Sequence, residues 1–526
     1  MEAKSIIIIF FTLTFSVLLV ALSISNEPER SNISYSPQYH FDPAAFYYKF
    51  RIEGDEELLR FLRIHNVSGK GMLNDPYVIS YLDISKVQGG IYIANTSLYV
   101  VFEDVNIHGP LPGSVLGVAI VNSKHIKFVN CTVKNDMKKS YSMGFYIKNS
   151  TDISIENFEF DDFTGKHSGI WIINSEHIHI RNTTLWNSRI GIWMTYSSNS
   201  SMSHLHITKG TGVVIGFSEN ISIYGSRLYV TGAGVELISS YDCRIRNNSF
   251  IENYEGIHSI DGNENSITDN SFLYSEYGIY MCGINSPTHH NIIRGNLFAY
   301  NQKYGIYLTC DGSNFIYENV FLNSTVKDEG YQRGSPYWNY PYAEHSLWNF
   351  SNRGNYWYSW VNKNDTNDRN HDGIVDYPYP IPGKTGVYDN HPLKIAPFSY
   401  ALIPSSPRNF TVEVQGKLII LKWQTPKYLS SQVMEYRIYK DGKLIAITSA
   451  NKTIYKRNIE SADGIYYVTA VDKYKRESSI SHSVVINQGN DFLVKILLIL
   501  ISIIIPLILV VMALISERKK DSAINE

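Results

Sequence analysis

The sequence predicts an all-β protein in which a right-handed parallel β-helix is followed by a β-sandwich and a C-terminal transmembrane helix. Three observations lead to this prediction. A short phrase (glycine, apolar, any residue, apolar) recurs every 21 to 27 residues between residues 117 and 308, and such a fixed period indicates a repeat architecture. Aromatic residues make up 13% of the chain, with 39 tyrosines, and they favour strands. A long apolar run lies close to the C-terminus.

The length and charge of the chain limit its organisation and its partners. At 526 residues it is longer than one ordinary domain, so two or more domains are expected. The formal net charge is -2, and a chain without a basic excess lacks the electrostatic footprint of a nucleic-acid binder. We therefore expect no nucleic-acid partner.

Both ends of the chain are apolar. Residues 1–25 have the pattern of a secretory signal peptide or of an N-terminal membrane anchor, and residues 26–50 look like an irregular stalk. Residues 496–515 are long enough to cross a bilayer, and the basic residues after them place the tail, residues 516–526, in the cytoplasm. The sequence therefore predicts a cell-membrane protein with an extracellular ectodomain, held by a C-terminal anchor alone or by an anchor at each end.

N-glycosylation sequons agree with an extracellular location and predict a glycoprotein. They include Asn32, Asn66, Asn95, Asn149, Asn182, Asn323, Asn409 and Asn451.

Residues 51–397 are predicted to form the β-helix together with a cover at each end. Residues 56–64 place Leu58, Phe61 and Leu62 on one face of an amphipathic helix, which suits a cap over the first coil. Past Phe321 the repeat gives way to an aromatic and polar stretch, whose bulky rings are expected to cover the last coil.

Each repeat has the same internal order. In Gly144-Phe-Tyr-Ile147, for example, the two residues flanking Tyr146 point inward and Tyr146 points outward, because successive side chains of a strand alternate. Corners rich in Asn and Ser separate the short strands. Asn tolerates left-handed backbone geometry, and stacked Asn side chains can form ladders along the axis. Three short strands per repeat of about 22 residues describe a parallel β-helix.

A second domain follows the β-helix. Residues 398–407 form a linker, and residues 408–488 alternate like the strands of a β-sandwich. Trp423 on a strand and Tyr466 at the position of a tyrosine corner resemble a fibronectin type III domain without a disulfide. Such a resemblance implies a spacer or an adhesion surface.

Several motifs of the β-helix region together resemble the NosD-type family of right-handed β-helices. They are Gly69-Lys-Gly71 with Asp75-Pro-Tyr-Val-Ile79, the repeated glycine phrase, Gly354-Asn-Tyr-Trp357 and Asp389-Asn-His-Pro-Leu393. The resemblance covers residues 50–397 and implies a β-helix related to the class that binds or hydrolyses carbohydrates. It carries over no catalytic residue.

The outward middle position of the phrase is the first candidate site. Strands of successive coils stack about 4.8 Å apart, so these side chains are expected to form one column on the outside of a sheet. Rings suit stacking on sugars, and the alternative is that they pack beneath loops or only support strand structure. The rings expected to bind carbohydrate are Tyr92, Tyr146, Trp171, Trp193, Tyr280 and Tyr307.

The same column carries the candidate catalytic residues. Glu236 and His258 follow each other in it, and a carboxylate beside an imidazole can serve as acid and base on a sugar. Hydrolases of this chemistry usually need two carboxylates, however, and the sequence does not show a second one for this site.

Residues 368–379 begin like a calcium loop with Gly373 at position 6. Oxygen donors occupy positions 1, 3, 5 and 9, namely Asp368, Asn370, Asp372 and Asp376. Position 12 is Tyr379 instead of glutamate. We expect a structural Ca²⁺ here, and the alternative is an Asx-rich turn without metal.

The cysteines and histidines suggest two further sites. Cys282 and Cys310 follow the glycines of neighbouring coils, so a disulfide between them is expected in an oxidising compartment. Cys131 and Cys243 are expected to be buried thiols. His177, His179, His204 and His206 lie on consecutive coils and are candidate copper ligands. No Met or Cys is grouped with these histidines, so solvated side chains are the favoured interpretation.

The sequence thus favours a membrane-anchored surface protein that binds polysaccharide or cell-surface glycans through its aromatic column. One alternative is a carbohydrate-active enzyme, a lyase, epimerase or hydrolase, on the same face. The other is a structural surface glycoprotein.

Overall fold

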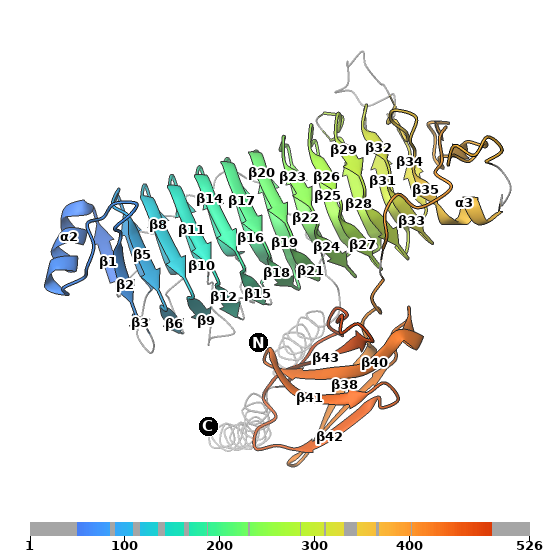
Figure 1. Ribbon diagram of the computed structural model, residues 1–526. Coiled ribbons are helices and arrows are strands. Elements are labelled where there is room, and N and C mark those ends of the chain that lie inside the picture. The colour runs from blue at the N-terminus through green and yellow to red at the C-terminus, as the bar shows by residue number, and fades with distance from the viewer. Residues whose placement is uncertain are drawn as a thin grey trace, which may run out of the picture. The chain divides into compact units, whose positions relative to one another are not determined.

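Three parallel sheets run side by side along one axis (Figure 1), and each coil but the last gives one strand to each sheet. The computed structural model describes residues 50–84, 90–108, 116–134, 143–161, 168–186, 188–229, 232–284, 286–309, 312–330, 345–363, 368–400 and 402–486. The predicted parallel β-helix of the right-handed type is confirmed.

The strands of the β-helix belong to the sheets as follows. The first sheet contains β1 (Phe50–Glu53), β4 (Ile91–Ala94), β7 (Leu116–Val121), β10 (Met143–Lys148), β13 (Ser168–Ile173), β16 (Ile190–Thr195), β19 (Thr211–Gly216), β22 (Ala233–Ile238), β25 (Glu255–Ile260), β28 (Tyr277–Cys282), β31 (Tyr304–Thr309) and β34 (Val326–Asp328). The second contains β2 (Tyr77–Ser80), β5 (Val100–Glu103), β8 (Lys124–Val129), β11 (Thr151–Glu156), β14 (Glu176–Arg181), β17 (Ser198–Ser203), β20 (Glu219–Tyr224), β23 (Arg244–Arg246), β26 (Ser266–Thr268), β29 (Ile292–Arg294) and β32 (Phe315–Tyr317). The third contains β3 (Asp83–Ile84), β6 (Asn106–His108), β9 (Thr132–Lys134), β12 (Glu159–Asp161), β15 (Thr184–Trp186), β18 (His206–Thr208), β21 (Arg227–Tyr229), β24 (Ser249–Ile251), β27 (Ser271–Leu273), β30 (Leu297–Ala299), β33 (Val320–Leu322) and β35 (Tyr356–Trp357).

The repeated phrase builds the core. Its two apolar positions are buried, as Ile170 and Ile172 show with 0% exposure. The glycine is required because a Cβ at Gly144 would lie 2.3 Å from a ring carbon of Phe160. Rings on the third sheet stack coil upon coil at 4.9 Å between centroids, in the order Phe250, Phe272, Phe298 and Phe321.

Asn side chains form the predicted ladders at the corners. On the exposed side, Asn149 Nδ2 donates to Asn122 Oδ1 at 3.1 Å, and both residues have a positive φ. A second ladder is buried and continuous. In this ladder the side-chain Nδ2 of each Asn donates to the Oδ1 of the Asn in the next coil, at 2.9 to 3.1 Å. Its members are Asn248, Asn270, Asn296, Asn319 and Asn355.

Both covers form where the sequence predicts them. Helix α2 (Asp55–Ile64) buries Leu58 and Leu62 over the first coil. At the other end, Trp357 is buried between the rings of Phe321 and Tyr379, at centroid distances of 4.3 and 3.9 Å. Strand β1 begins at Phe50, the last residue of the predicted stalk, and pairs with β4.

The C-terminal cover is organised around a buried carboxylate. Asp389 on β37 (Tyr388–Asp389), which pairs with β36 (Tyr379–Pro380), has 0% exposure. Its Oδ2 accepts hydrogen bonds from the Asn355 backbone N–H at 2.7 Å and from Trp357 Nε1 at 2.9 Å. The buried Asn ladder therefore ends on Asp389. The short helix α3 (Tyr358–Lys363) follows β35 directly.

A β-sandwich follows, with two antiparallel sheets. One contains β38 (Arg408–Gln415), β39 (Leu418–Gln424) and β42 (Ile454–Asn458), and the other contains β41 (Lys443–Ser449), β40 (Val433–Lys440), β43 (Gly464–Asp472) and β44 (Val484–Ile486), with a 3₁₀ turn η2 (Ser430–Gln432). Trp423 packs edge to face on Tyr436 in its core, with 5.4 Å between the ring centroids. The tyrosine-corner interpretation of Tyr466 is wrong, because its buried hydroxyl has no hydrogen-bond partner in the described part of the chain.

The apolar terminal runs, residues 1–25 and 496–515, lie outside the described residues. Within the described ranges, none of the helices is both long enough and apolar enough to span a bilayer.

Candidate functional site

The outward column of the first sheet has the predicted register. Successive strands pair Tyr92 with Ala119, Ala119 with Tyr146, Tyr146 with Trp171 and Trp171 with Trp193, and the series continues through Glu236, His258, Tyr280 and Tyr307. A cation stands over the ring at each end: the Arg51 guanidinium lies 4.3 Å from the Tyr92 centroid and Lys327 Nζ lies 5.6 Å from that of Tyr307.

At its N-terminal end, the column is too buried to serve as a binding face. Tyr92 is 4% exposed and Tyr146 is 1% exposed, so the expectation that these two rings face solvent is wrong. Alternation along a strand fixes the direction of a side chain and leaves open what covers it. Trp171, Trp193, Tyr280 and Tyr307 are half-buried, and their role in binding stays a prediction.

Rings gather at the C-terminal end of the column. Tyr280 stacks on Tyr307 with 5.2 Å between centroids and an interplanar angle of 11°. Tyr277 and Tyr304, which the sequence interpretation missed, lie just before the glycines of the same strands and join this cluster at 5.8 and 5.2 Å. Lys303 Nζ stands 5.2 Å from the Tyr277 centroid. The four tyrosines form a ring cluster with a cationic edge.

Glu236 and His258 are neighbours, as predicted, but they are not each other's closest partners. His258 Nδ1 lies 3.9 Å from Glu236 Oε1, whereas Glu255 Oε2 lies only 3.1 Å away. The other ring nitrogen, Nε2, lies 3.6 Å from Cys282 Sγ. Sequence reasoning missed Glu255 because it stands before the glycine of its strand, outside the column.

The protonation of His258 follows from these contacts. Burial alone would lower the pKa of His258, but the hydrogen bonds to Cys282 and Glu255 and the charge of Glu255 raise it to about 10. His258 is therefore an imidazolium at neutral pH.

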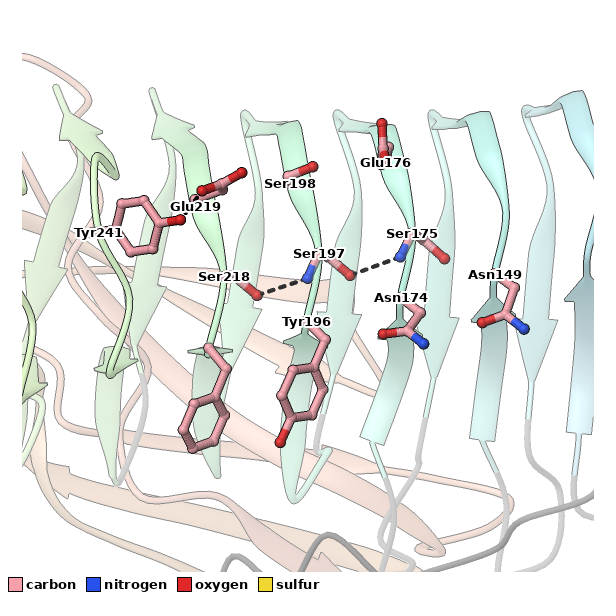
Figure 2. Close-up of a pocket in the computed structure, with 11 residues that line it drawn as sticks. Asn149, Asn174, Ser175, Glu176, Tyr196, Ser197, Ser198, Ser218, Glu219 and Tyr241 are labelled. Atoms are coloured by element: carbon pink, nitrogen blue, oxygen red, sulfur yellow. Dashed lines mark hydrogen bonds between the residues drawn. The ribbon is translucent and has the colours of Figure 1, made fainter.

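A groove of about 590 Å³ lies along the corners between the first and second sheets (Figure 2). One wall is aromatic: Tyr196 and Phe217 stack with 5.2 Å between centroids and an interplanar angle of 9°, and they are 50% and 46% exposed. The facing wall contains Glu176 and Glu219, and Tyr241 donates its hydroxyl hydrogen bond to Glu219. Exposed aromatic rings and carboxylates therefore line the same groove.

The floor of the groove is a row of buried serines (Figure 2). The backbone N–H of Ser175 donates to Ser197 Oγ, and that of Ser197 donates to Ser218 Oγ, both at 3.1 Å. The Ser175 and Ser218 hydroxyls donate in turn to backbone carbonyls at 2.8 Å. Because each hydroxyl both donates and accepts, the floor is held in one arrangement.

The sequence does contain a signal for this groove. Asn149 and Asn174 occupy a left-handed corner position directly before a serine, and in the next two coils the same position holds Tyr196 and Phe217, also with positive φ. A bulky ring in a left-handed corner is uncommon. Aligning the corners, instead of the strands alone, would have found it.

The predicted calcium loop folds around Asp368. Its two carboxylate oxygens accept hydrogen bonds from the backbone N–H groups of Asp372 and Gly373 at 3.0 and 3.1 Å. Asp376 accepts from the Arg369 N–H at 3.1 Å. The donors are of the oxygen class that Ca²⁺ prefers. In the described ranges, however, no three His, Cys, Asp or Glu side chains gather closely enough to hold a metal ion, so calcium stays a prediction.

Calcium is expected to raise the melting temperature of the chain by a few degrees, because a ligand that binds only the folded state stabilises it. Thermal unfolding with calcium and after chelation measures the effect. Asp368→Asn should abolish it, whereas Asp75→Asn, at a carboxylate elsewhere on the surface, should not. An equal melting temperature with and without calcium would reduce the loop to an Asx-rich turn.

The remaining predicted ligands do not gather in the described residues. Cys282 is a free buried thiol, and Cys310 lies outside the described residues, so their disulfide stays a prediction. The histidines have separate partners. His179 contacts Ser201 at 2.8 Å, and burial, followed by the charge of Arg227, lowers the pKa of His206 to about 4.

Comparisons with known proteins extend the fold assignment. The family model described as "Periplasmic copper-binding protein (NosD)" matches residues 66–255 and 162–361. No curated protein sequence matches the chain.

Solved structures match parts of the chain at low identity and low TM-score. The A-module of the mannuronan C-5 epimerase AlgE4 from Azotobacter vinelandii has 14% identity and a TM-score of 0.38, with 52% of this chain and 91% of that chain covered. DFA-IIIase from Arthrobacter chlorophenolicus A6 has 10% identity and a TM-score of 0.38, with 54% and 84% covered. A central fibronectin-III array of RIM-binding protein has 22% identity and a TM-score of 0.15, with 16% and 36% covered.

Proposed function

The chain belongs to the NosD family, whose model matches more than half of it, and from this premise we propose that the protein is an extracytoplasmic β-helix that binds polysaccharide on its outer surface. The observation that carries the proposal is the groove of Figure 2, where the stacked and exposed rings of Tyr196 and Phe217 face two carboxylates. The apolar face of a sugar stacks on such rings, and its hydroxyls donate hydrogen bonds to carboxylate oxygens.

The charge of the groove selects the kind of saccharide. Glu176 and Glu219 are the charged side chains in its lining, and the lining contains no Lys, Arg or His. An anionic sugar would meet repulsion without a compensating cation. We therefore propose a neutral, hydroxyl-rich polysaccharide or glycan as the ligand.

Two variants test this proposal with little damage to the fold. Tyr196→Asn and Phe217→Asn remove a ring and keep a residue that tolerates the left-handed corner, as Asn174 and Asn149 do one and two coils before Tyr196. Each is expected to weaken binding about tenfold, or about 1.4 kcal/mol, because each removes one stacking surface. Affinity electrophoresis in neutral polysaccharides and a glycan array measure the change.

Tyr224→Ala is the matched control, because that ring is 44% exposed and lies outside the groove. It should bind as the unchanged chain does. The absence of affinity for any glycan, or equal affinity in both groove variants, would overturn the proposal and favour a purely structural surface glycoprotein.

The aromatic column is proposed as a second surface, in the part that remains accessible. Trp171 and Trp193 stack at 5.3 Å, and the ring cluster around Tyr280 and Tyr307 has Lys303 and Lys327 at its edge. These cations suit an acidic sugar better than the groove does. Trp171→Ala or Tyr307→Ala would then reduce binding of acidic glycans alone.

Carbohydrate-active catalysis is the second candidate function, favoured by the imidazolium of His258 between Glu236 and Glu255. These groups could pass protons to and from a sugar bound at the ring cluster. Release of reducing ends or unsaturated sugars would support this activity. Its persistence in Glu236→Gln would remove Glu236 from the catalytic residues.

Copper, which the family description names, does not fit the described residues. Soft ligands such as Cys and Met bind Cu(I), and imidazoles bind Cu(II) in groups. In the part of the chain that the structure describes, no three potential ligands come together. We derive no step through copper.

We also propose that the terminal apolar segments attach the protein to a membrane and that residues 408–488 act as a fibronectin-like spacer. Residues 496–515 suit a membrane-spanning helix by length and by the basic residues after them. Membrane fractionation of the full chain and of a chain ending at residue 490 tests this. A full chain that stays out of the membrane fraction would contradict both anchors, and a shortened chain that still sediments with membranes would show that the C-terminal segment is not the sole anchor.

A further inference from the structure

Three side chains on the outer face of the first sheet lie in line. Glu255 and His258 come from β25, and Cys282 is the last residue of the neighbouring strand β28. Glu255 Oε2 lies 3.1 Å from His258 Nδ1, and His258 Nε2 lies 3.6 Å from Cys282 Sγ. A carboxylate thus orients an imidazole whose far nitrogen points at a sulfur, which is the arrangement of a thiol nucleophile with its base and orienting group.

The surroundings keep the imidazole in place and charged. Tyr280 stacks on its face, with 5.0 Å between centroids and an interplanar angle of 10°. Glu236, on β22, adds a second carboxylate at 3.9 Å. As an imidazolium, His258 donates from Nδ1 to Glu255 and from Nε2 to the sulfur. A cation beside a sulfur stabilises the thiolate, which is the nucleophilic form of cysteine.

The other described cysteines have the opposite environment. Cys131 Sγ donates to the Val129 carbonyl at 3.1 Å, and Cys243 Sγ to the Tyr241 carbonyl at 3.5 Å. Burial raises the pKa of Cys131 to about 11 and that of Cys243 to about 12. These two thiols stay protonated at neutral pH and serve as internal controls.

We propose that Cys282, His258 and Glu255 form an acyl-transfer site that hydrolyses small carboxylic esters through a thioester on Cys282. The thiolate is the nucleophile, His258 is the general acid and base, and Glu255 is a positioning residue. Because Cys282 is 9% exposed, the proposed substrates carry a small acyl group such as acetyl. The site lies on the first sheet, apart from the groove, and the proposal does not depend on saccharide binding there.

The chemical steps balance with water as the co-reactant. The sulfur attacks the carbonyl carbon, the bond from that carbon to the alcohol oxygen breaks, and His258 Nε2–H protonates the departing alkoxide. A thioester on Cys282 and a neutral imidazole remain. Water then attacks the thioester while His258 takes its proton, the carbon–sulfur bond breaks, and the carboxylic acid leaves. The net reaction converts an ester and water into an acid and an alcohol.

Alkylation of the full-length chain tests the nucleophile. Iodoacetamide is expected to label Cys282 at neutral pH at least about tenfold faster than free cysteine, because an imidazole stands 3.6 Å from its sulfur. Peptide mapping by mass spectrometry assigns the labelled residue, and Cys131 and Cys243 should stay unlabelled in the folded chain. His258→Asn and Glu255→Gln should slow the labelling of Cys282 toward the rate of free cysteine.

Ester cleavage tests the activity. The full chain should release p-nitrophenol from p-nitrophenyl acetate in a burst of one equivalent, followed by turnover, and trapping in acid should recover acetyl on Cys282. Cys282→Ala and Cys282→Ser should abolish the burst, whereas Cys243→Ser and the groove variant Tyr196→Asn should retain it. Loss of glycan binding in Tyr196→Asn with an intact burst would separate the two proposals.

Three results would overturn the acyl-transfer site. The first is an intact mass and peptide map showing Cys282 in a disulfide with Cys310, which would leave no thiolate. The second is labelling of Cys282 at the rate of free cysteine, unchanged in His258→Asn. The third is the absence of a burst even though Cys282 is rapidly alkylated.

Discussion

Replacing Asn270 by alanine is expected to lower the free energy of unfolding by about 4 kcal/mol. Its Oδ1 accepts hydrogen bonds from the Asn248 N–H at 2.9 Å and from Asn248 Nδ2 at 3.1 Å, and its Nδ2 donates to the Ile245 carbonyl at 2.8 Å. Alanine leaves the Asn248 N–H and the Ile245 carbonyl without these partners in a buried corner. Each loss costs about 1 to 3 kcal/mol.

Denaturant unfolding of the full chain measures this change. Asn106→Ala is the control, because Asn106 is exposed and accepts one hydrogen bond, from Thr132 at 2.6 Å. The control should change stability by no more than about 0.5 kcal/mol. Equal effects of the two substitutions would mean that the buried ladder contributes no more to stability than a surface contact does.

The stability of the C-terminal cover is expected to fall as the pH rises from about 4 to about 6. Burial, only partly offset by hydrogen bonds from Asn355, Trp357 and His391, raises the pKa of Asp389 from 3.8 to about 6. The folded state therefore holds a proton that the unfolded state has released. The stabilising contribution is complete below pH 3.8 and is lost as the pH passes about 6, and the pKa difference corresponds to about 3 kcal/mol.

Asp389→Asn isolates the contribution of Asp389 to the pH dependence of stability, because an amide does not titrate in this range. Unfolding measured at several pH values should show a smaller decrease between about pH 4 and pH 6 in the variant than in the unchanged chain. Parallel pH profiles for the two chains would show that Asp389 ionises in the folded protein as it does in the unfolded one.

The architecture could be predicted because it depends on local periodicity. Gly144, Phe145 and Ile147 fix which side of a strand faces inward, and the same phrase in the next coil fixes the register. The Asn corners follow from the backbone geometry that Asn tolerates. The burial of Tyr146 could not be predicted, because it depends on what lies over the sheet and not on the strand itself.

The site around His258 depends on side-chain contacts between residues that are not register partners on neighbouring strands. His258 meets Cys282, which is two residues further along the neighbouring strand than its register partner Tyr280. It also meets Glu255, which stands before the glycine of its own strand. Aligning the repeats by column places each of these residues in a different column. Their contact appears only when side-chain length and direction are known.

The serine floor of the groove has a consequence for the thermodynamics of binding. Ser175, Ser197 and Ser218 are fixed to one another and to the backbone before any ligand arrives. A sugar that stacks on Tyr196 and Phe217 would order little of the protein around it, so the loss of conformational entropy on binding would fall mainly on the ligand. Stiffer saccharide chains should therefore bind more tightly than flexible ones of the same composition.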